Sequence, residues 1–155
     1  GMSKRLTHLD EQGRAQMVDV SGKPIVRRRA VAEAFLHAKQ DTLDRIMCGD
    51  LPKGEALAVA RLAGIQAAKR VDALIPLCHT LPLDHVEVCF ERSGDDAIRI
   101  EASATVTART GVEMEALTAA TVAGLTLWDM TKAIDADLRI DGTRLVLKEK
   151  TPLAY

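Results

Sequence analysis

Aromatic residues are scarce in this sequence. Its 155 residues include two Phe, one Tyr and one Trp, together 3% of the chain. Proteins that bind single-stranded nucleic acid stack the bases on aromatic side chains, and this chain has few to offer. Neither charge is in excess, because 21 Lys and Arg are balanced by 22 Asp and Glu. We therefore expect no nucleic-acid partner and no membrane partner, although a local basic cluster would suffice to hold a small anion.

Cysteine is also rare. Cys48, Cys78 and Cys89 form neither a CxxC pair nor an even-numbered disulfide framework, so we expect reduced thiols and a cytoplasmic location. The sequence has no run of 18 apolar residues, and its first residues do not resemble a signal peptide. Gly1 before Met2 is typical of the remnant of a cleaved tag, so the expected domain starts at Met2.

The common catalytic and cofactor motifs are missing. The sequence contains no GxxxxGK[ST] phosphate loop, no GxGxxG dinucleotide motif, no GxSxG nucleophile elbow and no HExxH zinc motif. Their absence argues against the corresponding nucleotide-binding, hydrolase and metalloprotease classes. Any chemistry must come from scattered polar residues.

The composition is that of a folded domain, with 47% hydrophobic and 28% charged residues. No linker divides the chain, so we expect one domain over residues 2–155 with loosely ordered termini. Residues 17–20 are a short strand candidate before a turn at 21–24, and residues 25–38 fit a strand or a helix. Two helices are predicted at 42–48 and 55–70, and Gly64 inside the second indicates the close approach of another backbone.

The second half of the chain mixes strand and helix patterns. A loop at 75–82 contains two prolines, and the alternating runs 86–90 and 98–102 predict a hairpin. Residues 112–134 predict a helix of about six turns. Two short strands, 138–140 and 145–147, are predicted on either side of Asp141-Gly142. This order predicts an α+β fold, with helices packed on one face of an antiparallel sheet.

Four places carry polar residues that stand out: Lys53 before the second helix, Lys69 at its end, the loop pair Cys78-His79, and the two ends of the long helix. Carboxylates in a first helical turn and cations in a last one also complement the helix dipole. Taken singly, five of the charged positions therefore have a purely structural explanation: Glu113, Glu115, Lys69, Arg70 and Lys132.

The pair Cys78-His79 has two further interpretations. With Asp84, His85 and Cys89 it would form a zinc site, but the spacing fits no usual template. A nucleophilic Cys78 activated by His79 is also weakly supported, because sequence neighbours seldom point at each other. The run 27–29 consists of three arginines, which form either a solvated surface or, on a strand, a phosphate site made by Arg27 and Arg29.

Helix length limits which of these residues share a site. Glu113 and Lys132 are nineteen positions apart, so a continuous helix separates them by roughly 28 Å. Lys53 and Lys69 would be separated by roughly 24 Å. If all these groups act together, the sites must lie between protomers, each helix contributing its start to one pocket and its end to another. Asp129 and Lys132 lie three positions apart and share one helix face.

Several long segments, in the right order, closely resemble the MoaC family of cyclic pyranopterin monophosphate synthases, enzymes of molybdenum cofactor biosynthesis. The matching segments are residues 17–20, 53–54, 58–70, 74–79, 111–119 and 125–133. The likeness extends from about residue 6 to about residue 147 and, taken jointly, outweighs the structural explanations of the single positions. Departures from the family pattern include Glu55, Val71, Thr80 and Trp128, where Asp, Thr, Pro and Tyr are usual; none of them replaces a proposed acid/base residue.

The resemblance implies a ferredoxin-like α+β fold and a homohexamer, a trimer of dimers, with active sites at subunit interfaces. It also implies a lyase that converts 3′,8-cyclo-7,8-dihydroguanosine 5′-triphosphate into cyclic pyranopterin monophosphate and releases pyrophosphate. No cofactor and no resident metal are implied, and a role for Mg²⁺ with the triphosphate is left open. Two rival interpretations are a catalytically silent nucleotide-binding protein on the same fold and a zinc-binding assembly protein.

Site residues follow from the resemblance by motif. Asp129 and Lys132 of one protomer, with Lys53 of its neighbour, form the implied acid/base set. The implied substrate pocket is lined by Leu77, Cys78, His79, Met114 and Glu115, with Glu113 and Lys69 near it. The Glu115 carboxylate would accept N–H bonds from the guanine-like edge of the substrate. Lysines and His79 would neutralise the triphosphate, with Arg27 or Arg29 as further candidates.

Overall fold

The structure, a computed structural model, describes residues 9–154 of the chain. The elements in chain order are β1 (Val26–His37), α1 (Gln40–Cys48), α2 (Ala56–Ala68), α3 (Val71–Leu74), β2 (His85–Ser93), β3 (Ala97–Ala108), α4 (Glu113–Thr131) and β4 (Arg139–Thr151). In the described part of the chain, no helix has the length and apolar character needed to cross a membrane.

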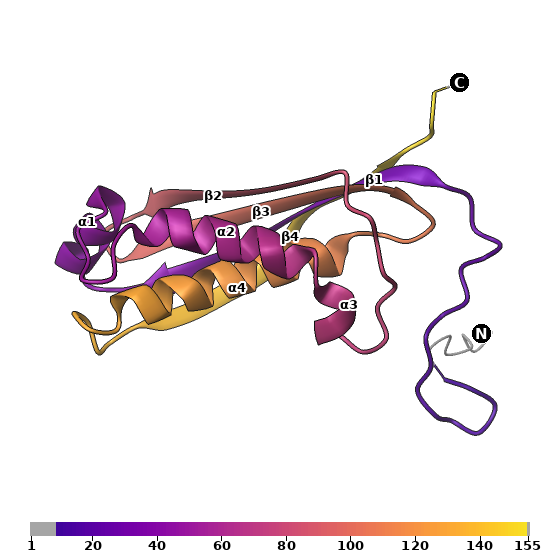
Figure 1. Cartoon of the computed structure of the whole chain (residues 1–155), viewed down its shortest axis with the longest axis horizontal. Helices are drawn as coiled ribbons and strands as arrows, with labels where there is room; N and C mark the ends of the chain where they lie inside the picture. Colours follow the sequence, from indigo (N-terminus) through magenta and orange to yellow (C-terminus); the bar gives the residue numbers. More distant parts are fainter. Residues whose placement is uncertain (1–8, 155) are drawn as a thin grey trace.

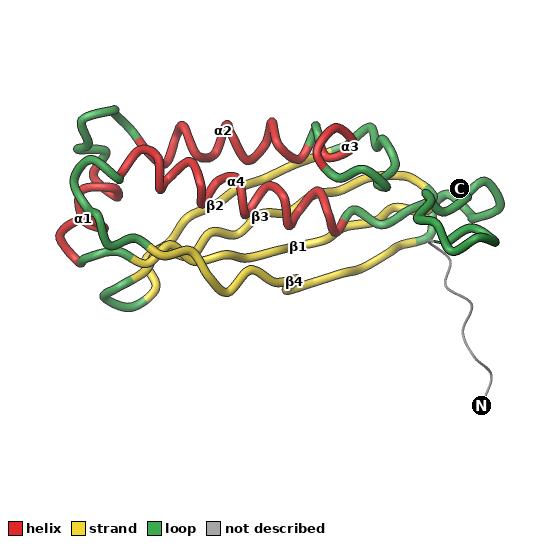
Figure 2. Tube along the Cα trace, turned by 90° about the horizontal axis from the view of Figure 1, so that it is seen from below, coloured by secondary structure: helices red, strands yellow, loops and turns green. Residues whose placement is uncertain are grey.

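The four strands form one antiparallel sheet in the order β2-β3-β1-β4. The long helices α2 and α4 lie side by side over one face of this sheet, and α1 lies at one end (Figure 1). Seen from the side, the helices form one layer and the strands the other (Figure 2). This arrangement confirms the predicted α+β class, and the strand order with its two crossover helices is that of a ferredoxin-like fold.

The segment that fitted both a strand and a helix is the central strand β1. Its residues Ala30, Ala32 and Ala34 alternate toward the helices and are buried in the core. Two of them lie opposite small residues of β3 in the register, Ala30 opposite Ala104 and Ala32 opposite Ala102. The helix propensity of alanine is overridden here, because the pairing of β1 with two neighbouring strands buries one complete face.

Small residues also bring α2 and α4 close together. A Cβ atom on Gly64 of α2 would lie 2.9 Å from the backbone oxygen of Ala119 and 3.4 Å from the Cβ of Ala123, both in α4. The close approach predicted from Gly64 is therefore confirmed. The two helices run antiparallel, so the start of α2 meets the end of α4.

Two strand predictions were wrong. Residues 17–20 form no strand and run as an extended loop, because no neighbouring strand pairs with them. The two short strands predicted around Asp141-Gly142 are one continuous strand, β4. Gly142, with φ of 67°, lies in an irregular stretch where the register with β1 shifts, and the Phe35 ring occupies the space that a side chain at Gly142 would need. The glycine therefore makes an irregularity within the strand, not a turn between two strands.

The chain ends are only partly described. Residues 1–8 and 155, including most of the N-terminal segment expected to be loosely ordered, lie outside the described residues. Within the described part, Leu9 and Ala15 pair in an isolated bridge. Element ends elsewhere differ by a few residues from the predicted ones, and the short helix α3 was not predicted.

Candidate active site

Three charged side chains meet where α2 begins and α4 ends. The Asp129 carboxylate accepts one bond on each oxygen: from Lys132 Nζ at 2.9 Å on Oδ1 and from Lys53 Nζ at 3.1 Å on Oδ2. Lys53 Nζ also lies 3.4 Å from the backbone oxygen of Asp129. We call this group of Lys53, Asp129 and Lys132 the lysine–aspartate cluster.

The electrostatics of the cluster keep its carboxylate ionised. The ammonium of Lys132, and next to it that of Lys53, lowers the pKa of Asp129 below its usual range. All three side chains are exposed; Asp129, for example, has 57% of its side-chain surface accessible. The carboxylate therefore holds two ammonium groups side by side at the surface, where both can reach a bound molecule.

The local sequence explains this placement. Gly54, with φ of 105°, lets the chain turn sharply after Lys53, and its N–H bonds to the oxygen of Leu51. At the end of α4, the backbone N–H of Lys132 donates a hydrogen bond to the backbone oxygen of Trp128, which fixes the position of Lys132. The expectation that Lys53 reaches Asp129 from a neighbouring protomer was wrong, because the antiparallel packing of α2 on α4 brings them together within one chain. Helix length alone gave no sign of this packing.

A cavity of about 610 Å³ lies at the opposite end of the two helices. Six of the seven predicted pocket residues line it: Leu77, Cys78, His79, Glu113, Met114 and Glu115. Its other walls include Val18, Asp19 and Lys23 from the loop before β1. We call this cavity the helix-start pocket.

His79 fastens the N-terminal loop over the helix-start pocket. Its Nε2 lies 2.7 Å from the backbone oxygen of Val18. Because a carbonyl oxygen only accepts, Nε2 carries the proton of this bond and donates it. The loop that contains Asp19 and Lys23 is thereby held along the pocket.

Burial makes the pocket an unusual setting for its acidic groups. Glu115 is only 4% exposed, and this burial raises its pKa to about 7, with the carboxylates of Glu113 and Asp72 adding to the rise. Burial and the charge of Glu115 also raise the pKa of the Cys78 thiol. A thiol held in its neutral form is a poor nucleophile, so the structure argues against Cys78 as an activated cysteine.

The zinc interpretation finds no support in the geometry. Cys78 and His79 line the helix-start pocket, whereas His85 lines a different cavity and Cys89 points away from the helices on β2. Among residues 9–154, no three His, Cys, Asp or Glu side chains gather closely enough to hold a metal ion. Lys69, the remaining predicted pocket residue, lies with His85 along that other cavity and not in the helix-start pocket.

The cluster and the pocket are separate within one chain. Asp129 and Glu115 belong to the same helix, fourteen residues apart, which corresponds to roughly 21 Å along its axis. One small molecule cannot touch both. Each chain therefore presents two partial sites, one at each end of the helix pair.

Some residues that line the helix-start pocket were not predicted from the sequence. Asp19 and Lys23 fell in a segment interpreted as a strand and turn, and nothing local marked them as pocket residues. A second, smaller cavity beside the helix-start pocket is lined by Arg28, Lys148 and Lys150 among others. The arginine run at 27–29 signalled part of this lining, because Arg29, one of the two predicted phosphate candidates, borders the cavity together with Arg28, whereas Arg27 does not.

Comparison with known proteins adds family information. The sequence model of the MoaC family matches residues 17–151. Two curated relatives are named cyclic pyranopterin monophosphate synthase. The protein from Roseiflexus castenholzii is 53% identical over 144 residues, covering 92% of this chain and 91% of its own length. The protein from Chloroflexus aggregans is 50% identical over 149 residues, covering 96% of this chain and 90% of its own length.

Proposed function

We propose that this chain, which belongs to the MoaC family and is an enzyme of the lyase class in molybdenum cofactor biosynthesis, acts on a cyclised guanosine triphosphate. The proposed substrate is 3′,8-cyclo-7,8-dihydroguanosine 5′-triphosphate. The products are cyclic pyranopterin monophosphate and pyrophosphate. The observation that carries this proposal is the lysine–aspartate cluster, in which one carboxylate aligns two ammonium groups.

The reaction requires both proton transfer and charge neutralisation. A cyclic monophosphate forms when a hydroxyl oxygen of the substrate attacks the α-phosphorus, while the bond to the β-phosphate oxygen breaks and pyrophosphate leaves. Rebuilding the purine-derived ring as a pterin needs further proton transfers. Lysines act as general acids or bases, and ammonium groups stabilise developing negative charge. Lys53 and Lys132 are proposed to exchange these protons, with Asp129 orienting both.

The helix-start pocket is proposed to hold the purine-derived end of the substrate. Its volume and mixture of apolar and polar walls fit a small heterocycle. Glu115 lies at its base in a setting that raises its pKa, and its carboxyl oxygens can accept N–H bonds from an amino-pyrimidinone edge. His79 and Lys23 add positive or hydrogen-bonding groups on the opposite walls.

A complete site then requires two chains. The lysine–aspartate cluster of one chain and the helix-start pocket of another would meet at a subunit interface, which would also cover the exposed cluster. The outer side of the helix layer supports assembly, because Val59, Leu62, Leu125 and Trp128 are exposed there. We propose a homohexamer built as a trimer of dimers.

The direct test is pyrophosphate release from the cyclised substrate. Lys53→Ala is expected to reduce release by at least about 100-fold, the lower range for a lost acid/base group. Lys39→Ala is the matched control, since Lys39 is an exposed lysine before α1 that neither pairs with Asp129 nor lines the helix-start pocket. Analytical ultracentrifugation of each variant checks that assembly is unchanged. Binding of the substrate by well-assembled native protein without any release would instead identify a silent binding protein.

A further inference from the structure

The loop between α3 and β2 is tied to α3 by one side-chain hydrogen bond. Residues 77–79 of this loop line the helix-start pocket. The next residue, Thr80, donates a hydrogen bond of 2.6 Å from its hydroxyl to Oδ2 of Asp72 in α3. In the described part of the chain, no other side-chain hydrogen bond joins the loop 76–84 to a helix. A short bond to a carboxylate is of the stronger, charge-assisted kind.

The far end of the same loop is held by the sheet. The backbone N–H of Asp84 donates to the Thr105 oxygen at 2.8 Å, and the Asp84 carboxylate accepts a bond of 2.9 Å from the Thr107 hydroxyl. Both partners belong to β3. The half that lines the pocket has no such bond to a strand, and its other polar contacts run within the turn 75–78 and, from His79, to the N-terminal loop. The bond to α3 therefore decides where this half lies.

The element that receives the bond is itself well anchored. Val71, the first residue of α3, is buried in the core with 2% of its surface exposed. Asp72 follows it at the surface and has no cationic partner in the described part of the chain, so its carboxylate is free to bind the Thr80 hydroxyl.

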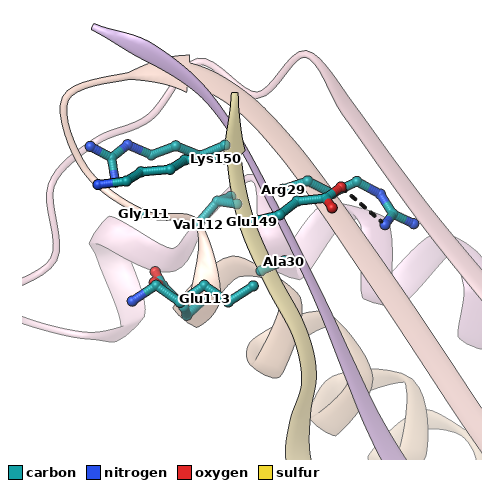
Figure 3. Close-up of a pocket in the computed structure, with 9 residues that line it drawn as sticks. Arg29, Ala30, Gly111, Val112, Glu113, Glu149 and Lys150 are labelled. Carbon is teal, nitrogen blue, oxygen red and sulfur yellow. Dashed lines mark ion pairs between the residues drawn. The ribbon is translucent and has the colours of Figure 1, made fainter. Parts of the chain in front are cut away.

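The charge of Asp72 also acts on the pocket. It adds to the rise in the pKa of the buried Glu115. Glu113 acts on Glu115 in the same direction, but it pairs at 2.7 Å with Lys148 Nζ in the smaller cavity (Figure 3), which offsets part of its charge. The charge of Asp72 is not offset in this way. The other titratable groups along the pocket are Asp19, Lys23, Cys78 and His79.

From these contacts we propose that Thr80 and Asp72 form a clamp that positions Cys78 and His79 in the helix-start pocket and places a negative charge beside Glu115. The proposal rests on the function proposed above. Thr80 is a positioning residue, because it does not line the pocket and acts through its neighbours. The clamp serves the end of the helix pair that is proposed to hold the substrate, not the lysine–aspartate cluster. We therefore expect it to change KM and not kcat.

Steady-state pyrophosphate release by the assembled protein tests the clamp. Thr80→Val removes the hydroxyl and keeps the branched shape, so the KM for the cyclised substrate should rise about threefold to tenfold, the effect of one lost hydrogen bond, while kcat stays within about twofold. Thr80→Ser keeps the hydroxyl and should keep KM within about twofold of native. Thr107→Val is the matched control, because it removes the Thr–Asp bond at the end of the loop that the sheet also holds, and it should leave both constants unchanged. Sedimentation of each variant confirms assembly.

Asp72→Asn separates the charge from the hydrogen bond, since asparagine keeps an oxygen for the Thr80 hydroxyl but carries no charge. The pH dependence of kcat/KM reports the ionisations of the free enzyme. The inflection expected near pH 7 from Glu115 should move to lower pH in Asp72→Asn and stay in place in Asp95→Asn. An inflection that does not move in Asp72→Asn would overturn the role of the charge.

Other results would overturn the positioning role of Thr80. Equal KM values in Thr80→Val and Thr107→Val, or a KM in Thr80→Ser as high as in Thr80→Val, would each do so. A second readout does not depend on activity: alkylation of Cys78 by iodoacetamide, located by mass spectrometry, should be about threefold to tenfold faster in Thr80→Val, with the exposed Cys48 as the internal reference.

The two readouts distinguish failure of the clamp from failure of the proposed function. If the native protein releases pyrophosphate but neither KM nor the alkylation of Cys78 changes in Thr80→Val, the clamp is wrong while the function stands. If the alkylation changes as expected but the native protein converts no substrate, the function fails while the clamp stands.

Discussion

The buried carboxyl group of Glu115 gives a quantitative prediction of how the free energy of unfolding depends on pH. Its side chain is 4% exposed, and its pKa is raised to about 7 from an ordinary value of 4.5. Below pH 4.5 the group is protonated in both the folded and the unfolded chain, so it places no charge in the core. As the pH rises through 7, the folded chain must carry a buried negative charge, and the stability present at low pH is lost. The difference between the two pKa values corresponds to about 3 kcal/mol.

The substitution Glu115→Gln isolates this effect, because glutamine has the shape of the protonated acid and does not ionise. The difference in free energy of unfolding between the variant and the native protein should be small at pH 4.5. It should grow in favour of the variant to as much as about 3 kcal/mol at pH 8. Urea unfolding at both pH values, at one protein concentration, measures it, since assembly also contributes to stability. If the difference in free energy of unfolding between the variant and the native protein did not change with pH, Glu115 would not carry a buried, uncompensated charge at high pH.

The remaining predictions concern packing, a buried ion pair and the cluster. Gly64→Ala should destabilise the protein by about 1–2 kcal/mol, because the new Cβ meets a backbone oxygen that cannot move aside. Gly124→Ala should be tolerated, because the nearest neighbour of its new Cβ is the Ile100 side chain at 3.4 Å. Thermal unfolding compares the two variants. Glu33 is buried on the sheet face opposite the helices, and Arg144 and Arg99 lower its pKa. Glu33→Ala should therefore cost about 1–3 kcal/mol at pH 7, and the loss should shrink as the pH falls through the lowered pKa; a cost that persists in acid would contradict this. Asp129→Asn should lower the rate of pyrophosphate release by at least about 100-fold without changing the fold. The control Asp95→Asn, in the β2–β3 turn, should leave the rate of release unchanged. Equal rates in the two variants would show that Asp129 takes no part in the site.

Much of the fold could be predicted because its signals are local. Periodicity located the helices α1, α2 and α4 and the β2–β3 hairpin, and Gly49, in the left-handed conformation, ends α1 where expected. The predicted close approach at Gly64 also followed from one residue. The ambiguous segment 25–38 needed its neighbours, because its alanines become strand residues only when paired on both sides.

The parts that were mispredicted depend on long-range packing. Gly142 looks like a turn residue, but the Phe35 ring beside it and the pairing with β1 keep β4 continuous. Lys53 and Asp129 are 76 positions apart, and only the antiparallel helix pair joins them.

The pocket residues were found for a different reason. Six of them belong to segments that resemble the MoaC family, and the structure brings those six to one cavity. Asp19 and Lys23 reach the same cavity through the bond from His79 to Val18, a contact between segments 61 positions apart. No local pattern in the sequence encodes that contact.

The central claim is that the lysine–aspartate cluster of one chain acts with the helix-start pocket of another on the cyclised guanosine triphosphate. The most direct measurement is pyrophosphate release by a mixed assembly of Lys53→Ala and His79→Ala chains, co-expressed with different tags and purified through both. Each variant alone should be inactive. Random mixing should restore about one quarter of the sites, because a site recovers only when each chain supplies its intact half. A mixed assembly that remains as inactive as the separate variants would contradict the account.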